Sequence, residues 1–256
     1  MSITVHLDQH IKTLAINQPE RKNALNLDII RALKVGIDES QKDGTRLIIL
    51  TGTGTDFCAG IDLNSTAAGG SFDVTHYLRT EVNPLILAIQ NSKVPVLAKV
   101  KGVAVGLGFS LALACDLILA DETARFSQIF SQIGLATDGG SAYFLTRRLG
   151  YQKAFELTTL ATMLDAQEAH RLGLINQLTT PENLDNLVDQ FAQKLVNGAI
   201  LAFQQIKENL QIGLNQSLED TLDAEAVAQG KCFQTADFVE GVMAFMQKRK
   251  ANFRGI

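Results

Sequence analysis

The stretch Lys101-Gly-Val-Ala-Val-Gly-Leu-Gly-Phe-Ser-Leu-Ala-Leu-Ala-Cys-Asp116 joins a short strand, a glycine-rich turn and an apolar helix. The first N–H groups of a helix have no partner inside it and lie at the positive end of its dipole. A helix that starts after Gly106 therefore suits an anion or a developing oxyanion. A structural explanation is also open, because glycine allows a strand and a helix to pack closely.

Strands alternate with helices on both sides of this stretch. Alternating or continuous apolar residues predict strands over 3–7, 11–16, 46–51 and 94–100, and a helical period covers 26–43 and 74–91. Residues 3–7 and 11–16 read as a half-buried hairpin. This order predicts a layered α/β core.

From Tyr151 onward the pattern is almost wholly helical. Plausible helices cover 166–172, 181–196, 199–212, 218–233 and 238–249, and few strands remain to pair there. We expect an α/β core over residues 1–195 and a helical C-terminal region over residues 196–256, with no flexible linker between them.

Composition excludes several classes of protein. Of the 256 residues, 46% are hydrophobic and 20% are charged, which is ample for a packed core and excludes wholesale disorder. A net charge of -4 argues against a nucleic-acid partner held by phosphate contacts. The longest apolar runs are too short to span a bilayer and the N-terminus lacks the apolar core of a secretion signal, so we expect a cytoplasmic protein without membrane contact. The cysteines and histidines are scattered, which predicts reduced thiols and no metal site.

The segment Asp56-Phe-Cys-Ala-Gly-Ile-Asp-Leu63 follows the strand that ends near Thr51. Gly60, just before Ile61, lets the backbone bend so that a peptide N–H points into a cleft. An ordinary loop is an equally good interpretation, because turns rich in Gly and Asp are common.

In the segment Ser131-Gln-Ile-Gly-Leu-Ala-Thr-Asp-Gly-Gly-Ser-Ala-Tyr143, Asp138 precedes two glycines at the start of a predicted helix. A carboxylate there can cap the free N–H groups of the helix. It can instead act as a general base, held by flexible neighbours close to a substrate. Both interpretations are open from the residues alone.

Other motifs fail or are weak. The turn Gly52-Thr-Gly-Thr-Asp-Phe57 lacks the third glycine of a dinucleotide fingerprint, and no glycine-rich turn is followed by Gly-Lys-Ser/Thr. Residues 108–112 approach a nucleophile elbow, so a hydrolase using Ser110 and His170 is conceivable. An apolar helix would bury the Ser110 hydroxyl, however, and no acid partner for His170 is evident.

Taken together, the three segments resemble the crotonase superfamily, also called the enoyl-CoA hydratase/isomerase family. The resemblance runs from Pro19-Glu-Arg-Lys-Asn-Ala-Leu25 to the tail at residues 244–253, over nearly the whole chain. It implies an α/β crotonase fold, a spiral of ββα units with a C-terminal helical trimerisation region, assembled as a homotrimer or homohexamer. It also implies an acyl-CoA thioester substrate, so that coenzyme A is part of the substrate and no cofactor is needed.

The resemblance also assigns residues. The thioester enolate would be held by the backbone N–H groups of Ile61, after Ala59-Gly60, and Leu107, after Gly106. The residues that border coenzyme A in this pattern are Ala59, Ile61, Asp62 and Leu63, with Lys22 near the phosphates and Phe245 and Lys248 closing the pocket from the tail, sometimes the tail of a neighbouring subunit.

The acidic residues differ from those of the best-known members. Hydratases of the family carry two glutamates, and the matching positions here are Ser110 and Phe130. Asp138 instead matches the single acid of several enoyl-CoA isomerases, so the chain most resembles these single-carboxylate members. The resemblance therefore implies isomerisation of a 3-enoyl-CoA to a 2-enoyl-CoA, with Asp138 moving the proton and apolar neighbours raising the pKa of its carboxyl group. Another crotonase reaction, such as hydration or thioester hydrolysis, and a non-catalytic acyl-CoA-binding role stay open, as does the role of Ser110.

Overall fold

Two β-sheets form the centre of the structure, a computed structural model that describes residues 3–63 and 73–256. The larger sheet has six strands in the order β1-β2-β3-β4-β6-β9, and the smaller has three in the order β5-β7-β8. In the larger sheet only β1 and β2 pair antiparallel among the described strands. The strands are β1 Ile3–Asp8, β2 Ile11–Ile16, β3 Leu47–Gly52, β4 Val96–Val100, β5 Val103–Val105, β6 Leu117–Asp121, β7 Arg125–Ser127, β8 Leu164–Asp165 and β9 Gln177–Thr179.

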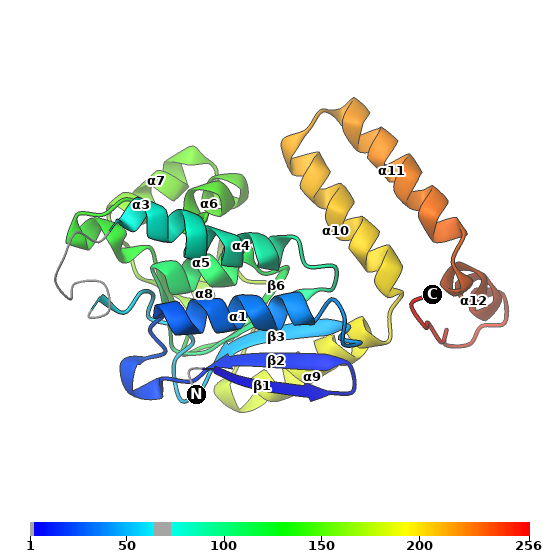
Figure 1. Cartoon of the computed structure of the whole chain (residues 1–256), viewed down its shortest axis with the longest axis horizontal. Helices are drawn as coiled ribbons and strands as arrows, with labels where there is room; N and C mark the ends of the chain where they lie inside the picture. The colour runs from blue at the N-terminus through cyan, green and yellow to red at the C-terminus, as the bar shows by residue number, and fades with distance from the viewer. Residues whose placement is uncertain (1–2, 64–72) are drawn as a thin grey trace.

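Helices cover the larger sheet and then extend away from it (Figure 1). They are α1 Leu27–Glu39, α3 Val74–Tyr77, α4 Asn83–Gln90, α5 Leu107–Ala114, α6 Ser141–Leu149, α7 Tyr151–Thr159, α8 Ala166–Arg171, α9 Leu184–Val196, α10 Ile200–Asn215, α11 Leu218–Phe233 and α12 Ala236–Met246. Shorter helical turns are η1 Pro19–Arg21, η2 Leu78–Val82, η3 Ile129–Ile133 and η4 Pro181–Asn183.

The two faces of the larger sheet are packed by different helices. On one face lies α1, whose start is capped by the Asn26 side chain accepting from the Ile29 N–H at 2.9 Å. On the other face α9 buries a stripe that includes Val188 and Ala192 against Leu47 of β3. Because both faces are covered, all six residues of β3 are buried, which explains its continuous apolar run.

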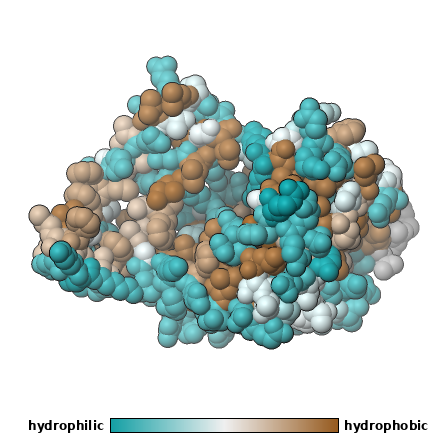
Figure 2. Space-filling model, turned by 180° about the vertical axis from the view of Figure 1, so that it is seen from behind, coloured by the Kyte–Doolittle hydropathy of each residue, from teal (hydrophilic) through white to brown (hydrophobic). Residues whose placement is uncertain are grey.

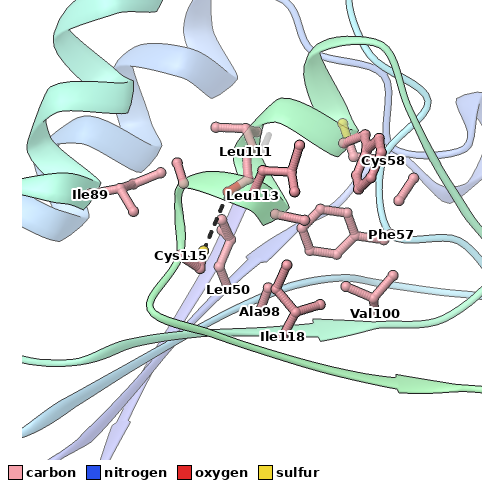
Figure 3. Packing of buried hydrophobic residues seen from close by; sticks show 14 of the residues in the cluster. Leu50, Phe57, Cys58, Ile89, Ala98, Val100, Leu111, Leu113, Cys115 and Ile118 are labelled. Atoms are coloured by element: carbon pink, nitrogen blue, oxygen red, sulfur yellow. Dashed lines mark hydrogen bonds between the residues drawn. The ribbon is translucent and has the colours of Figure 1, made fainter. Parts of the chain in front are cut away.

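Helix α5 is the most deeply buried helix in this part of the core. All eight of its residues are buried. Figure 3 shows Leu111 and Leu113 of α5 beside Phe57, which packs over Ala98 of β4 and Ile118 of β6. The helix is therefore held rigidly, and so is its N-terminal end.

Helices α10, α11 and α12 project from the core as an extension (Figure 1). Serine 217 and Asp220 form a capping box at the start of α11. The extension exposes large apolar side chains, among them Leu210, Leu214 and Phe245. Apolar surface is visible in brown and tan on the left of Figure 2. Exposed apolar surface of this extent is typical of an interface.

The layered α/β core and the later helices are confirmed, with two corrections. The region after Tyr151 is less uniformly helical than expected, because β8 and β9 add short strands there and β9 pairs parallel with β6. The predicted helix over 74–91 is interrupted by the π-helical turn η2 between α3 and α4. The division into residues 1–195 and 196–256 stays a prediction.

In the described ranges, no helix is both long and apolar enough to cross a membrane. Within the same ranges, no three or more His, Cys, Asp or Glu side chains gather where they could hold a metal ion.

Candidate active site

A cavity of about 300 Å³ lies where three of the predicted segments meet. Residues 59–61 form one wall, Gly106 and Leu107 at the start of α5 form the next, and Asp138 lies at the third. The rest of the lining is mostly apolar and includes Phe130, Ile133 and Leu135. Among the described residues that line it, Asp138 is the single carboxylate.

The segment that precedes Ile61 is fixed by main-chain hydrogen bonds on both sides. The Cys58 N–H donates to Val103 O at 2.9 Å, and the Leu25 N–H donates to Gly60 O at 2.7 Å. The Asp62 N–H then donates to Leu25 O at 2.8 Å, so the backbone groups on either side of Ile61 pair with Leu25. The Ile61 N–H itself donates to no acceptor in the described part of the chain.

The second backbone donor lies at the first residue of α5. Gly106 adopts φ 54° at the start of the helix, and no side chain caps this end. The Leu107 N–H accordingly has no acceptor among residues 3–63 and 73–256. A Cβ atom added to Gly60 would lie 3.5 Å from Leu107 N, so the two donor segments are in direct contact.

Glycine is required at Gly60 and Gly108 for this contact. Gly60 has φ +89°, and an added Cβ would lie 3.0 Å from Val105 O. A Cβ on Gly108 would overlap Cys58 O. The two glycines therefore allow α5 to approach the loop closely enough for both N–H groups to reach one cavity.

Asp138 does not cap α6. The helix is preceded by Gly140, in the left-handed region, and no side-chain cap is present; the Asp138 carbonyl accepts from the Ser141 N–H at 3.2 Å. The buried Asp138 Oδ1 has no hydrogen-bond partner in the described ranges. Burial raises the pKa of Asp138 from 3.8 to about 6. Of the two interpretations left open by the sequence, the structure thus disfavours the cap.

Tyr77 of α3 lies on the cavity wall and was not anticipated from the sequence. Burial, together with the charges of Glu81 and Asp138, raises the pKa of Tyr77 to about 12. Its hydroxyl group therefore stays protonated at neutral pH. The helical period of residues 74–91 gave no sign that Tyr77 would face Asp138.

Ser110 and Phe130 occupy different surroundings. Phe130 is buried and lines the cavity. Ser110, inside α5, does not line the cavity. Its hydroxyl group instead donates to Asp138 O at 3.0 Å. In the described ranges the Ser110 hydroxyl contacts Gly106 O, Asp138 O and Gln128 but not His170, so the two residues do not form a hydrolase pair.

The predicted coenzyme A residues fall into two groups. Ala59 and Leu63 line the cavity, and Lys22 lies beside it, its carbonyl accepting from the Ala59 N–H at 2.9 Å. Asp62 is buried and forms an ion pair with Arg21, a residue that the sequence did not single out.

The tail residues lie elsewhere. Phe245 of α12 is 86% exposed and lines a separate cavity with Phe253 and Ala199. Lys248 follows α12 and is also exposed. Neither residue lines the cavity of its own chain that holds Asp138.

Another cavity, of about 390 Å³, lies between α10 and the core. Its acid, Asp116, is paired with Lys207 at 2.9 Å and also accepts from the Val96 N–H at 2.8 Å. An acid so engaged is poorly placed to accept a proton from a ligand. The cavity at Asp138 is the better candidate for chemistry.

Two backbone donors without acceptors in the described ranges and one half-buried carboxylate around an apolar cavity define a class of enzyme that stabilises an oxyanion and moves a proton. The comparisons with known proteins agree with this class. Residues 7–255 match the family model for enoyl-CoA hydratase/isomerase, and the chain belongs to that family.

Individual relatives carry different activities in their names. The chain is 36% identical over 254 residues to a "Probable enoyl-CoA hydratase" of Rhodobacter capsulatus, covering 99% of this chain and 98% of that protein. It is 34% identical over 257 residues to the 1,2-epoxyphenylacetyl-CoA isomerase of Escherichia coli, with the same coverage. The crystal structure of an enoyl-CoA hydratase from Bacillus anthracis superposes with a TM-score of 0.95 at 28% identity, over 100% of both chains. The crotonase fold is thereby confirmed, and the reaction is one of acyl-CoA chemistry.

Proposed function

We propose that this protein is an enoyl-CoA isomerase that converts a 3-enoyl-CoA into a 2-enoyl-CoA. The observation that carries the proposal is Asp138, the single carboxylate among the described residues that line the apolar cavity, whose buried Oδ1 has no hydrogen-bond partner in the described ranges. Fatty acyl chains or related acyl groups are the substrates that this cavity suits.

The reaction needs one acid/base group and one place for negative charge. The Asp138 carboxylate removes a proton from the α-carbon, and the electron pair moves onto the thioester oxygen. The N–H groups of Ile61 and Leu107 then hold that oxygen, where a single donor contributes about 3 kcal/mol. Protonated Asp138 returns the same proton to the γ-carbon as the double bond moves and the carbonyl is restored.

The raised pKa of Asp138 suits it both to remove the proton from the α-carbon and to return it to the γ-carbon. At neutral pH a carboxyl group with a pKa of about 6 is mostly ionised and ready to accept a proton. The same raised pKa makes it a stronger base than an exposed aspartate. A positioned group of this kind contributes about a hundred- to ten-thousand-fold in rate.

We also propose the surroundings of the substrate. Lys22, Ala59, Asp62 and Leu63 contact coenzyme A, while Phe245 and Lys248 cover the cavity of a neighbouring subunit in a homotrimer or homohexamer. The apolar extension of α10 to α12 supports this assembly, because it leaves large side chains exposed in a single chain. The three cysteines are free thiols, which suits work in the reducing cytoplasm.

Replacement of the base tests the proposal. Purified Asp138→Asn, assayed with a 3-enoyl-CoA, is expected to lose at least about a hundredfold in kcat while the thioester still binds. Asp189→Asn on the exposed face of α9 makes the same chemical change away from the cavity and should keep full activity. Activity of Asp138→Asn within a few-fold of wild type would refute the role of Asp138.

Hydration is the second candidate, because a similar protein from Rhodobacter capsulatus is named as a hydratase. Ser110 and Phe130 speak against it, since hydration of this kind requires an acid/base pair on the water. Incubation with a 2-enoyl-CoA separates the two reactions, because a hydratase product gains the mass of one water and an isomerase product does not. Tight thioester binding with no turnover of either substrate would instead indicate a non-catalytic acyl-CoA-binding protein.

A further inference from the structure

A buried polar contact lies directly behind the candidate base. Ser110 is the one residue of α5 with a polar side chain, among Leu, Gly, Phe and Ala, and it is fully buried. Burying a hydroxyl group costs free energy unless it is hydrogen-bonded, so the partner of the Ser110 hydroxyl indicates what this residue does in the fold. That partner is the main-chain carbonyl of Asp138, at 3.0 Å.

The alternative partner is weaker. A serine inside a helix commonly donates to the carbonyl four residues earlier, and the Ser110 Oγ also lies 3.3 Å from Gly106 O. Because the hydroxyl group can donate only one proton, we assign its hydrogen bond to the nearer acceptor, the Asp138 carbonyl. Gln128, also buried, lies 3.5 Å from the Ser110 Oγ through its Nε2, at the outer limit of a hydrogen bond.

The Asp138 carbonyl holds the turn in two directions, because it accepts from Ser110 of α5 and, within the turn, from the Ser141 N–H at 3.2 Å. Gly139 and Gly140 both have positive φ, at +59° and +78°, so the backbone after Asp138 has the freedom of glycine and few side chains to hold it. A Cβ on Gly139 would lie 2.8 Å from the Ser110 Cβ, which shows how closely the turn rests on α5. The Ser110 hydroxyl thus links the glycine-containing turn at residues 138–140 to the fully buried helix α5.

We propose that Ser110 is a positioning residue that anchors the Asp138 main chain and thereby aims the Asp138 carboxylate into the cavity. The inference rests on the proposed function of Asp138 and deepens it.

Loosening the turn is expected to change the ionisation of Asp138. Partial burial raises the pKa of the Asp138 carboxyl group, and a freer turn would let water reach the buried Oδ1. The elements packed around Asp138 offer few other charges, because α5 and η3 have no ionisable residue. Tyr77 faces Asp138 from α3, with Glu81 nearby. The two arginines of α6 are engaged elsewhere, Arg147 with Tyr143 and Asn215 and Arg148 with Leu113 O. A shift on removal of the Ser110 hydroxyl would therefore report on solvation of Asp138.

The test is a pH titration of the Asp138 carboxyl by difference infrared spectroscopy, with the band assigned by its absence in Asp138→Asn. In Ser110→Ala the pKa is expected to fall from about 6 toward the ordinary aspartate value. The kcat for a 3-enoyl-CoA should fall about tenfold with KM within about twofold, because the base is misplaced while the binding walls remain. Added to Asp138→Asn, Ser110→Ala should cause no further loss of kcat.

Controls separate positioning from general stability. Ser40 is also buried and donates to a helix carbonyl, Gly36 O at 2.8 Å, so Ser40→Ala makes the same deletion far from the cavity and should change neither the pKa nor kcat. If Ser110→Ala fails to fold, Ser110→Cys keeps the volume and weakens the donor, and it should show the same two effects. An unchanged Asp138 titration and kcat in the folded variant would overturn the proposal. A shifted titration in a protein that isomerises nothing would uphold the anchor and reject the isomerase function.

Discussion

Removal of the Asp138 charge is expected to stabilise the protein while abolishing its reaction. The folded-state pKa of about 6 exceeds the ordinary 3.8, so ionised Asp138 is less favourable in the folded chain than in the unfolded chain. For a group of raised pKa the cost is absent below the unfolded pKa, grows as pH rises, and is complete above the folded pKa. The full difference corresponds to up to about 3 kcal/mol above pH 7 and roughly half of that near pH 5.

Urea denaturation of Asp138→Asn and wild type at equal protein concentration measures this difference. The free energy of unfolding of Asp138→Asn should exceed that of wild type by more at pH 8 than at pH 5, with the change completed by about pH 7. Asp189→Asn, exposed on α9, should show little difference at any pH. A gap between Asp138→Asn and wild type that does not vary with pH would show that the carboxylate is solvated, and the argument from burial would then be wrong.

Three further predictions follow from the site and its surroundings. The kcat/KM for a 3-enoyl-CoA should rise with pH through about 6, because the base must be ionised, and a flat profile from pH 5 to 8 would contradict this assignment. Gly60→Ala should lower kcat by about a hundredfold, because φ +89° and the contact with Val105 O force the Ile61 N–H to move; an unchanged kcat would exclude the Ile61 donor. Leu210→Lys combined with Leu214→Lys should shift the sedimentation coefficient to that of a single chain, because both leucines are exposed on α10; an unaltered oligomer would place the interface elsewhere.

Much of the fold could be predicted because its signals are local. The run Leu47–Gly52 begins with four consecutive branched apolar residues, and the stripe of Ile29, Ile30, Leu33 and Ile37 has a clear helical period. The strands β7, β8 and β9 escaped prediction because they have two or three residues, too few for any period to show, and the five-residue β6 was not predicted either. The pairing of β8 and β9 depends on tertiary contacts with β7 and β6 that no local pattern records.

The candidate site was predictable in its backbone and less so in its side chains. Glycines before Ile61 and Leu107 pointed to both candidate donors, because the turns there have the positive φ values that glycine adopts. Tyr77 could not be anticipated, since the turn η2 interrupts a segment that reads as an ordinary helix. The Ser110 contact with Asp138 O spans 28 residues, and only the assembled fold brings its two ends together.

The costs to stability in this region gather around one cavity. Gly60, Gly106 and Gly139 hold positive φ values there, two amides have no acceptor in the described ranges, and a carboxylate is buried without a partner for Oδ1. The buried carboxylate oxygen without a partner opposes folding, and a single substitution of Asp138 would remove it, whereas glycine is the residue that adopts these φ values at least cost. Under the proposed function, the oxygen of an acyl thioester would accept from the two amides, and its α-carbon would yield a proton to the Asp138 carboxylate. The shared location of these features therefore argues for a catalytic cavity more strongly than any one of them does.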